Sequence, residues 1–285
     1  MNFRFFLAHA TLVAGLSFVN CQAQVAYGTQ LGDDKYQPTI GQDGKDVIWV
    51  PTNDSMTDAM LKLANVGPDD LVYDLGAGDG KIAIAAAKTY GARSVGIEYN
   101  KDMADLATRN AQRAGVADKV KIIHGDIFVE DFSKATVLTL YLLPDLNLKL
   151  RPTILKMTPG TRVVANSFHM GDWEPDQMIG SGYPQGYFWV VPAQVAGKWI
   201  ISGIDGGKAD TLEIVQRYQK IAGTLTLGGK SQPILSASLN GNKFKFNFIE
   251  RSGQSRSVEG IVNGNTFSAK VSENLPIYEI TGTRK

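Results

Sequence analysis

The feature that most constrains the fold is a glycine-rich stretch between an apolar segment and an alanine-rich one. It reads VYDLGAGDGKIAIAAAK over residues 72–88. Residues 71–74 favour a buried strand, and residues 81–90 favour a helix. The glycines between them let the backbone turn sharply and approach a ligand closely, because no Cβ atom stands in the way. The stretch therefore predicts a strand, a tight turn and a helix, with a small molecule held at the turn.

Strand-like and helix-like segments alternate beyond this turn. Helices are predicted at 101–114 and 145–157, and strands at 94–98, 120–123, 135–140, 162–168 and 187–191. Strands separated by helices of this length indicate right-handed crossovers and a mostly parallel sheet. The strands lack polar alternation, as expected of strands that are covered on both faces. The sequence thus predicts an α/β domain over residues 48–192, whose first helix Asn53, Asp54 or Ser55 caps.

Short strands replace this pattern in the last third of the chain. Residues 243–248 read KFKFNF, a perfect alternation of polar and apolar side chains. Asn-Gly pairs at 240–241 and 263–264 are typical of hairpin turns. We therefore expect a small antiparallel all-β domain, a sandwich or barrel-like unit, over residues 193–285. The sequence assigns no chemistry to it.

Residues 1–23 have the pattern of a cleavable signal peptide. Arg4 and the amino terminus are positive, Phe5–Val19 is apolar but short for a membrane span, and small residues at 21 and 23 favour cleavage. The expectation is an exported protein, periplasmic or envelope-associated, whose residues 24–47 form a polar arm. An uncleaved anchor and a lipid-anchored Cys21 are the alternatives.

Composition excludes several kinds of site. Cys21 is the only cysteine, so a chain cleaved after Ala23 would have no disulfide, cysteine-zinc site or thiol nucleophile. The three histidines have no metal-ligand spacing, and we expect no metal site. The net charge of +1 disfavours a nucleic-acid partner.

Acidic residues mark the ends of the first three predicted strands of the α/β domain. Asp74 precedes the turn, Glu98 can accept hydrogen bonds from both hydroxyls of a ribose, and Asp126 can accept one from an adenine amino group. The turn is G-x-G-x-G, whereas dinucleotide sites prefer G-x-G-x-x-G, and no phosphate-binding loop is present. This pattern suits S-adenosylmethionine, which has a ribose but no phosphate. The predicted cofactor-binding residues are Asp74, Gly76, Gly78, Gly80, Glu98, Asp126 and Ile127.

With these residues the chain resembles the class I methyltransferases over roughly residues 46–191. The segments WVPT (49–52), DLGAGDGKIAIAAAK (74–88) and YLLPDLNLKLRP (141–152) are similar to the lysine-methyltransferase family whose mitochondrial members modify membrane-protein lysines, and to its bacterial relatives. Such relatives often continue from VAGKW into a β-rich extension. The resemblance implies a Rossmann-like, mostly parallel seven-stranded sheet, and in-line methyl transfer from S-adenosylmethionine to a protein lysine. It implies an acceptor beside Tyr141 and Pro144, with no base assigned.

Other readings remain open at this point. The chain could be an exported binding or interaction protein that keeps the fold without turnover, because the cofactor is made in the cytosol and the leader predicts export. A dehydrogenase is a further alternative, although Lys81 stands where the third glycine of a dinucleotide motif would be. Tyr141 could serve only in packing, and Asp145 could cap a helix rather than act as a base.

Overall fold

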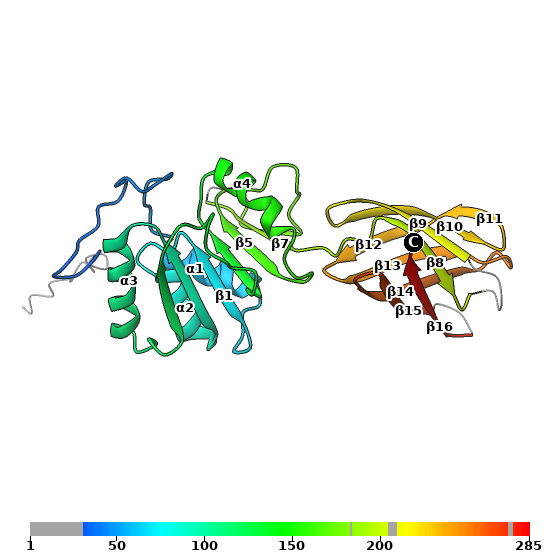
Figure 1. The fold of residues 1–285 in the computed structure, drawn as a ribbon, viewed down its shortest axis with the longest axis horizontal. Coiled ribbons are helices and arrows are strands. Elements are labelled where there is room, and N and C mark those ends of the chain that lie inside the picture. The colour runs from blue at the N-terminus through cyan, green and yellow to red at the C-terminus, as the bar shows by residue number, and fades with distance from the viewer. Residues whose placement is uncertain (1–30, 183, 205–209, 273–275) are drawn as a thin grey trace, which may run out of the picture. The chain divides into compact units, whose positions relative to one another are not determined.

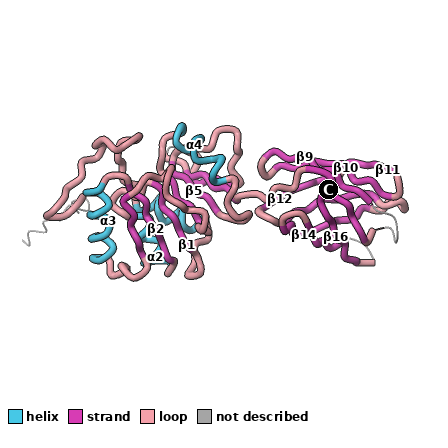
Figure 2. The backbone as a smooth tube through the Cα atoms, viewed as in Figure 1, coloured by secondary structure: helices cyan, strands magenta, loops and turns pink. Residues whose placement is uncertain are grey.

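The computed structural model describes residues 31–182, 184–204, 210–272 and 276–285, which form two β-sheets (Figure 1). The predicted signal peptide, residues 1–23, lies outside the described residues, as does the start of the predicted arm. The described helices all accompany the first sheet, and the second sheet is built from strands alone (Figure 2). None of the described helices has the length and apolar character that crossing a membrane would need.

The first sheet has seven strands in the order β3-β2-β1-β4-β5-β7-β6. Its strands are β1 (Leu71–Leu75), β2 (Arg93–Glu98), β3 (Val120–His124), β4 (Val137–Leu140), β5 (Arg162–Asn166), β6 (Gln177–Ile179) and β7 (Gly186–Val190). Strands β1 to β5 are mutually parallel, and β7 runs antiparallel to both of its neighbours. The Rossmann-like, mostly parallel seven-stranded sheet is confirmed. The sequence did not predict β6, because this short strand has no buried side chain to produce an apolar pattern.

Helices cover both faces of this sheet. They are α1 (Asp54–Leu63), α2 (Lys81–Tyr90), α3 (Lys101–Arg113) and α4 (Pro144–Ile154). Neighbouring residues of a strand point to opposite faces, so Val163 packs in a cluster with α4, and Val164 packs in another with α1 and α2. Asn53 caps α1, since its Oδ1 accepts a hydrogen bond of 2.7 Å from the backbone N–H of Met56.

The second sheet closes into an antiparallel barrel. Its strands are β8 (Gly197–Ser202), β9 (Asp210–Arg217), β10 (Lys220–Leu227), β11 (Lys230–Pro233), β12 (Leu235–Asn240), β13 (Lys243–Ile249), β14 (Ser255–Asn263), β15 (Thr266–Ser272) and β16 (Tyr278–Arg284). Strands β11 and β12 are the two ends of the sheet order, yet only Ile234 separates them in the chain. One bent segment therefore pairs with β10 through its first half and with β13 through its second.

The barrel interior is filled with apolar side chains. Phe244, Phe246 and Phe248 are buried in it, whereas Lys243 and Lys245 between them are exposed, as the alternation predicted. The predicted hairpin turns are present one residue later than expected, because Asn240 and Asn263 are the last residues of their strands. The all-β fold of this part of the chain is confirmed.

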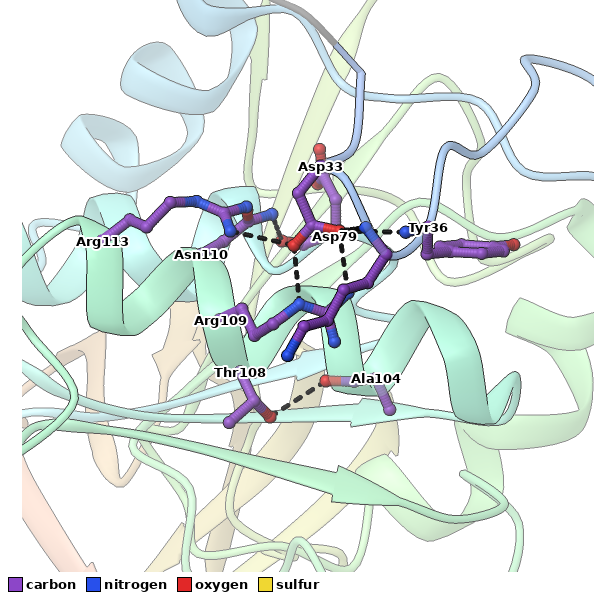
Figure 3. Close-up of polar contacts among 9 residues, drawn as sticks. Asp33, Tyr36, Asp79, Ala104, Thr108, Arg109, Asn110 and Arg113 are labelled. Atoms are coloured by element: carbon purple, nitrogen blue, oxygen red, sulfur yellow. Dashed lines mark hydrogen bonds and ion pairs between the residues drawn. The ribbon is translucent and has the colours of Figure 1, made fainter.

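The described part of the arm is tied to helix α3 by an acidic side chain (Figure 3). The Asp33 carboxylate accepts hydrogen bonds from Arg109 Nε at 2.6 Å and Nη2 at 3.0 Å, and from Arg113 Nη1 at 2.9 Å. It also accepts one from the backbone N–H of Tyr36 at 3.0 Å. The Arg109 guanidinium, followed by Arg113, holds the pKa of Asp33 well below its usual range. The Asp33 carboxylate is therefore ionised, and its ion pairs to α3 are kept, throughout the neutral range.

Replacing Asp33 by asparagine is expected to free the arm without disturbing its turn. An asparagine Oδ1 can still accept the Tyr36 N–H, but the ion pairs to α3 are lost. Limited trypsin digestion should then cut after Lys35 or Lys45 about tenfold faster. The parent protein in high salt should show a smaller change in the same direction, because these pairs are partly screened. Equal cleavage rates in variant and parent would contradict the anchoring role.

Candidate active site

A cleft opens at the carboxyl ends of the parallel strands, beside β1 and β4. These two strands are neighbours from which the strand order runs in opposite directions, and ligands of open α/β sheets bind at such a point. The cleft encloses about 910 Å³ with its open mouth included. Most of the predicted site residues line it: Asp74, Gly76, Gly78, Glu98, Asp126, Ile127 and Tyr141.

The glycine turn forms the floor of the cleft. Gly76, Gly78 and Gly80 all have φ in the left-handed region, at +83°, +55° and +82°, which glycine adopts without strain. A Cβ atom on Gly78 would lie 2.6 Å from Trp49 Nε1, so the indole packs directly on the turn. Gly80 does not line the cleft. It precedes α2, and its Cα faces Ala107 of α3.

Glu98 stands at the end of β2 with its carboxylate fixed by two backbone donors. Oε2 accepts a hydrogen bond of 2.8 Å from the N–H of Gly78, and Oε1 accepts one of 2.8 Å from the N–H of Asn100. Burial raises the pKa of Glu98 above its ordinary value, and the two N–H donors oppose that rise. Each oxygen keeps a lone pair for a further donor. The carboxylate can therefore receive the hydroxyls of a ribose lying across the turn.

Asp126 follows β3 and meets a lysine of the arm. Its Oδ1 accepts a hydrogen bond of 2.9 Å from the N–H of Phe128, and its Oδ2 lies 2.6 Å from Lys45 Nζ. Lys45 is the largest cause of the lowered pKa of Asp126. The same ammonium lies 5.0 Å from the centroid of the Tyr99 ring. No sequence pattern indicated this pairing, because Lys45 belongs to a polar segment far from Asp126 in the chain.

Asp74 is the buried acid of the cleft. The Thr139 hydroxyl on β4 donates a hydrogen bond of 2.7 Å to its Oδ1. Burial raises the pKa of Asp74 to about 7, and the nearby charges of Asp79 and Glu98 add to the rise. A cation bound in the cleft would favour the ionised carboxylate. Near neutral pH, binding of a positively charged ligand would therefore release a proton from the Asp74 carboxyl group.

This exchange predicts that the affinity for cationic S-adenosylmethionine rises with pH up to about 7, the raised pKa of Asp74. Binding stabilises the carboxylate, so a proton leaves on binding below that pH, and the binding constant grows as protons become scarce. Asp74→Asn keeps an acceptor for Thr139 and should flatten the dependence. Calorimetric titrations across this pH range measure the slope. If the Asp74→Asn variant kept the full dependence of the binding constant on pH, that dependence would come from Glu98 or Asp79 instead.

The two residues predicted on the acceptor side lie in different places. Tyr141 lines the cleft just beyond β4, and its ring stacks with Phe168 at a centroid distance of 6.4 Å. Pro144 does not line the cleft. It is the first residue of α4 and is exposed there, where proline's fixed φ and missing N–H suit the start of a helix. Asp145 is exposed in the first turn of α4, consistent with a role at the helix terminus.

Further cleft residues come from the segment that precedes α1. Trp49 and Thr52 both line the cleft, and the buried Thr52 Oγ1 lies 3.5 Å from Asn166 Nδ2 at the end of β5. The WVPT segment was noted for its resemblance, but nothing in its composition indicated that it folds back onto the glycine turn. Tyr99, exposed beside Glu98, is a further lining residue that the sequence did not single out.

The polar groups of the cleft suit S-adenosylmethionine. The space next to Gly78 is already limited by Trp49, so a side chain on the turn would intrude where a ligand has to approach. Carboxylates outnumber ammonium groups along the wall, and both lining lysines are paired, Lys45 with Asp126 and Lys81 with Asp54. Such a wall suits a ligand that has a ribose, an adenine amino group and a cationic centre.

Known proteins share this part of the chain. A model of the ANTKMT methyltransferase domain matches residues 74–177. A protein-lysine N-methyltransferase of Saccharolobus islandicus is 42% identical over 135 residues, which are 47% of this chain and 84% of that protein. A human lysine N-methyltransferase, named for an ATP synthase subunit, is 30% identical over 135 residues, and the match spans 57% of its length.

A solved structure agrees with these relatives. An RNA methyltransferase from Salinibacter ruber, crystallised with S-adenosyl-L-homocysteine, is 49% identical and superposes with a TM-score of 0.50. The match covers 51% of this chain and 96% of that one. The α/β part of the chain therefore has the fold of a known enzyme family. The chain belongs to the class I S-adenosylmethionine-dependent methyltransferases, within the protein-lysine methyltransferase family.

Proposed function

We propose that this protein transfers a methyl group from S-adenosylmethionine to a lysine amine of a protein acceptor. The observation that carries the proposal is one cleft that joins the Glu98–Gly78 contact on its cofactor side to Tyr141 on its other side. The names of the Saccharolobus islandicus and human relatives support lysine as the acceptor. Because the cofactor cleft is intact, a methyltransferase is favoured over a binding protein that only keeps the fold.

S-adenosylmethionine supplies an electrophilic methyl carbon, and the chain's part is to hold and orient the reactants. Glu98, Asp126 and the glycine turn would bind the adenosine. The acceptor amine must be neutral to attack, and the stacked Tyr141 and Phe168 rings provide apolar surface that favours the neutral form. The attacking nitrogen loses a proton after the transfer. As the N–C bond forms, the S–C bond to the methyl group would break and S-adenosyl-L-homocysteine would leave. We assign no base, so the proton of the methylammonium product passes to water.

The charge of the cleft favours an amine over a nucleic acid. Its wall carries Asp46, Asp79, Glu98 and Asp126, and its two lysines are already paired. Carboxylates attract a lysine ammonium toward the site, whereas they repel a phosphate backbone. The Salinibacter ruber relative bears the name of an RNA methyltransferase, so RNA is the acceptor class that a test must separate from protein.

The test incubates the purified protein with tritium-labelled S-adenosylmethionine and a whole-cell extract. Label that survives ribonuclease, is lost with protease and appears as methyl-lysine after hydrolysis supports the proposal. Label that ribonuclease removes would replace it with an RNA acceptor. If calorimetry detects tight cofactor binding but no extract accepts label, the chain is a binding protein.

We also propose that the protein is exported and acts in the cell envelope. The support is the sequence alone: a positive amino terminus, an apolar run and small residues before Gln24. Cell fractionation followed by amino-terminal sequencing of the isolated protein tests this. A mature chain that starts at Gln24 in the periplasmic fraction is expected. A full-length chain in the cytosol would contradict export.

A further inference from the structure

The loop that follows β5 connects a residue of the cleft wall, Tyr141, with the barrel. It begins at Ser167, whose φ of +64° is left-handed, and it continues to Asp176 just before β6. Phe168 in this loop stacks on Tyr141, which lines the cleft. The Asn147 side chain of α4 donates a hydrogen bond of 3.2 Å to the Phe168 carbonyl. The first half of the loop thus packs behind the cleft wall, against Tyr141, although none of its own residues lines the cleft.

The second half of the loop is held by the turn between β9 and β10. Trp173 Nε1 donates a hydrogen bond of 3.0 Å to Gln219 Oε1, and Gln219 Nε2 donates one of 2.7 Å to the Glu174 carbonyl. The Tyr218 ring stacks on Trp173 at 6.0 Å, and its hydroxyl donates a hydrogen bond of 3.0 Å to Asp172. Both ends of the Gln219 amide, and both the ring and the hydroxyl of Tyr218, are therefore engaged by the loop.

Flanking ion pairs strengthen this contact. Asp172 lies 3.0 Å from Arg217 Nη2 and 2.6 Å from Arg151 Nη1 of α4, and Lys220 Nζ lies 2.5 Å from Glu174. The Arg217 guanidinium is the largest cause that lowers the pKa of Asp172 to about 2. The pairs therefore persist throughout the neutral range. The turn residues Tyr218 and Gln219, with Arg217 and Lys220 on either side of them, therefore each contact the loop through their side chains.

Comparison with the other two-residue turns of the barrel shows that tyrosine is an unusual residue at the position of Tyr218. Tight turns join β10 to β11, β12 to β13 and β14 to β15, and each begins with a glycine: Gly228, Gly241 and Gly264. Their φ angles are +55°, +57° and +59°, and Tyr218 has the same position and a φ of +55°. Glycine is strongly preferred there, and a tyrosine is strained. Backbone strain of this kind is typical of residues whose side chains have a functional role, here the contacts of Tyr218 with the loop.

A chain of rings links this turn to the Tyr141 side of the cleft. Trp173 is fully buried, and its carbonyl accepts a hydrogen bond of 2.9 Å from Trp189 Nε1. Trp189 stacks on Tyr187 at 6.0 Å, and Tyr187 meets His169 edge to face at 6.1 Å. His169 adjoins Phe168 in the loop. Displacing Trp173 would therefore disturb the loop from His169 onward, directly after Phe168.

We propose that the barrel positions the acceptor-side loop of the methyltransferase site through the turn residues Tyr218 and Gln219. This proposal rests on the proposed function in one respect, namely that the acceptor lies beside Tyr141. Tyr218 and Gln219 are positioning residues, since they touch the loop and not the cleft. The barrel is accordingly part of the acceptor-binding apparatus, although the matched family model, over residues 74–177, ends before it.

The deciding variant is Tyr218→Gly, which gives this turn the glycine of the other three turns. The barrel should fold at least as well, because glycine adopts this φ without strain. Hydrogen exchange in residues 167–176 should accelerate about tenfold in the full chain. With poly-L-lysine as the probe acceptor, KM should rise about tenfold while kcat changes less. Calorimetry should find the affinity for S-adenosylmethionine unchanged.

Controls separate positioning from general damage. Gln219→Ala should behave like Tyr218→Gly and replaces it if that variant fails to fold. Tyr218→Phe keeps the ring and should restore most of the parent behaviour, and Lys230→Ala, an exposed change at the β10–β11 turn, should alter nothing. Unchanged exchange in the loop, or an equal loss of cofactor affinity, overturns the proposal. If the parent does not methylate poly-L-lysine, lysine as the acceptor is in doubt, and the exchange measurement still decides whether the turn positions the loop.

Discussion

Replacing Glu98 by alanine should weaken the binding of S-adenosylmethionine at least a hundredfold. A hydrogen bond to a charged group contributes about 1.5–3 kcal/mol, and two ribose hydroxyls would lose their acceptor together. The change also leaves the N–H groups of Gly78 and Asn100 without the carboxylate that now aligns them. Isothermal titration of the purified chain with S-adenosylmethionine measures the loss directly.

The stability of the free protein should change little in this variant. Burial raises the pKa of Glu98, so the ionised group is not a source of folding stability in the empty cleft, and water can reach the N–H groups it leaves. The melting temperature should therefore stay within about 4 °C of the parent. Glu98→Gln keeps one acceptor oxygen and should lose only about tenfold in affinity. An alanine variant that bound the cofactor normally would remove Glu98 from the cofactor site.

The sequence predicted well what local patterns determine. Helix α2 runs from Lys81 to Tyr90 as its alanine-rich composition indicated, and strands β1 to β5 occupy the expected apolar runs. Apolar runs separated by helices specify a parallel sheet, whose carboxyl ends meet at one edge. Glu98 and Asp126 were predicted to meet the glycine turn for that reason, and both line the same cleft.

What the sequence could not predict depends on contacts between distant segments. Lys45 pairs with Asp126, Trp49 covers Gly78, and Gln219 holds Trp173, yet none of these partners is near the other in the chain. Polar and aromatic residues in loops have no periodicity from which a partner can be inferred. Pro144 was predicted beside the acceptor because segment 141–152 resembles the sequences of the family. In the structure it begins α4 and does not line the cleft. Only the folded geometry assigns such residues.

Substituting Gly78 by alanine should damage the cofactor site more than its single methyl group suggests. Two costs combine at this position, a φ of +55° and a Cβ atom 2.6 Å from Trp49 Nε1. The backbone cost alone is about 1–2 kcal/mol for a residue with a side chain. Relief of the contact requires Trp49 or the turn to shift, and a shift of the turn also moves the N–H that Glu98 accepts. We expect the affinity for S-adenosylmethionine to fall about thirtyfold or more.

Two comparisons isolate the contact from the backbone strain. Gly115→Ala, at a φ of +72° with no atom within 4 Å of its Cβ position, carries the strain without the collision. It should lower stability by about 1–2 kcal/mol and leave cofactor binding intact. In a Trp49→Leu background, Gly78→Ala should cost less than in the parent, because the atom it meets is gone. If Gly78→Ala lowered the affinity equally in the parent and in the Trp49→Leu background, the indole would not limit the turn. A Gly115 variant with impaired binding would mean that strain alone is transmitted to the cleft.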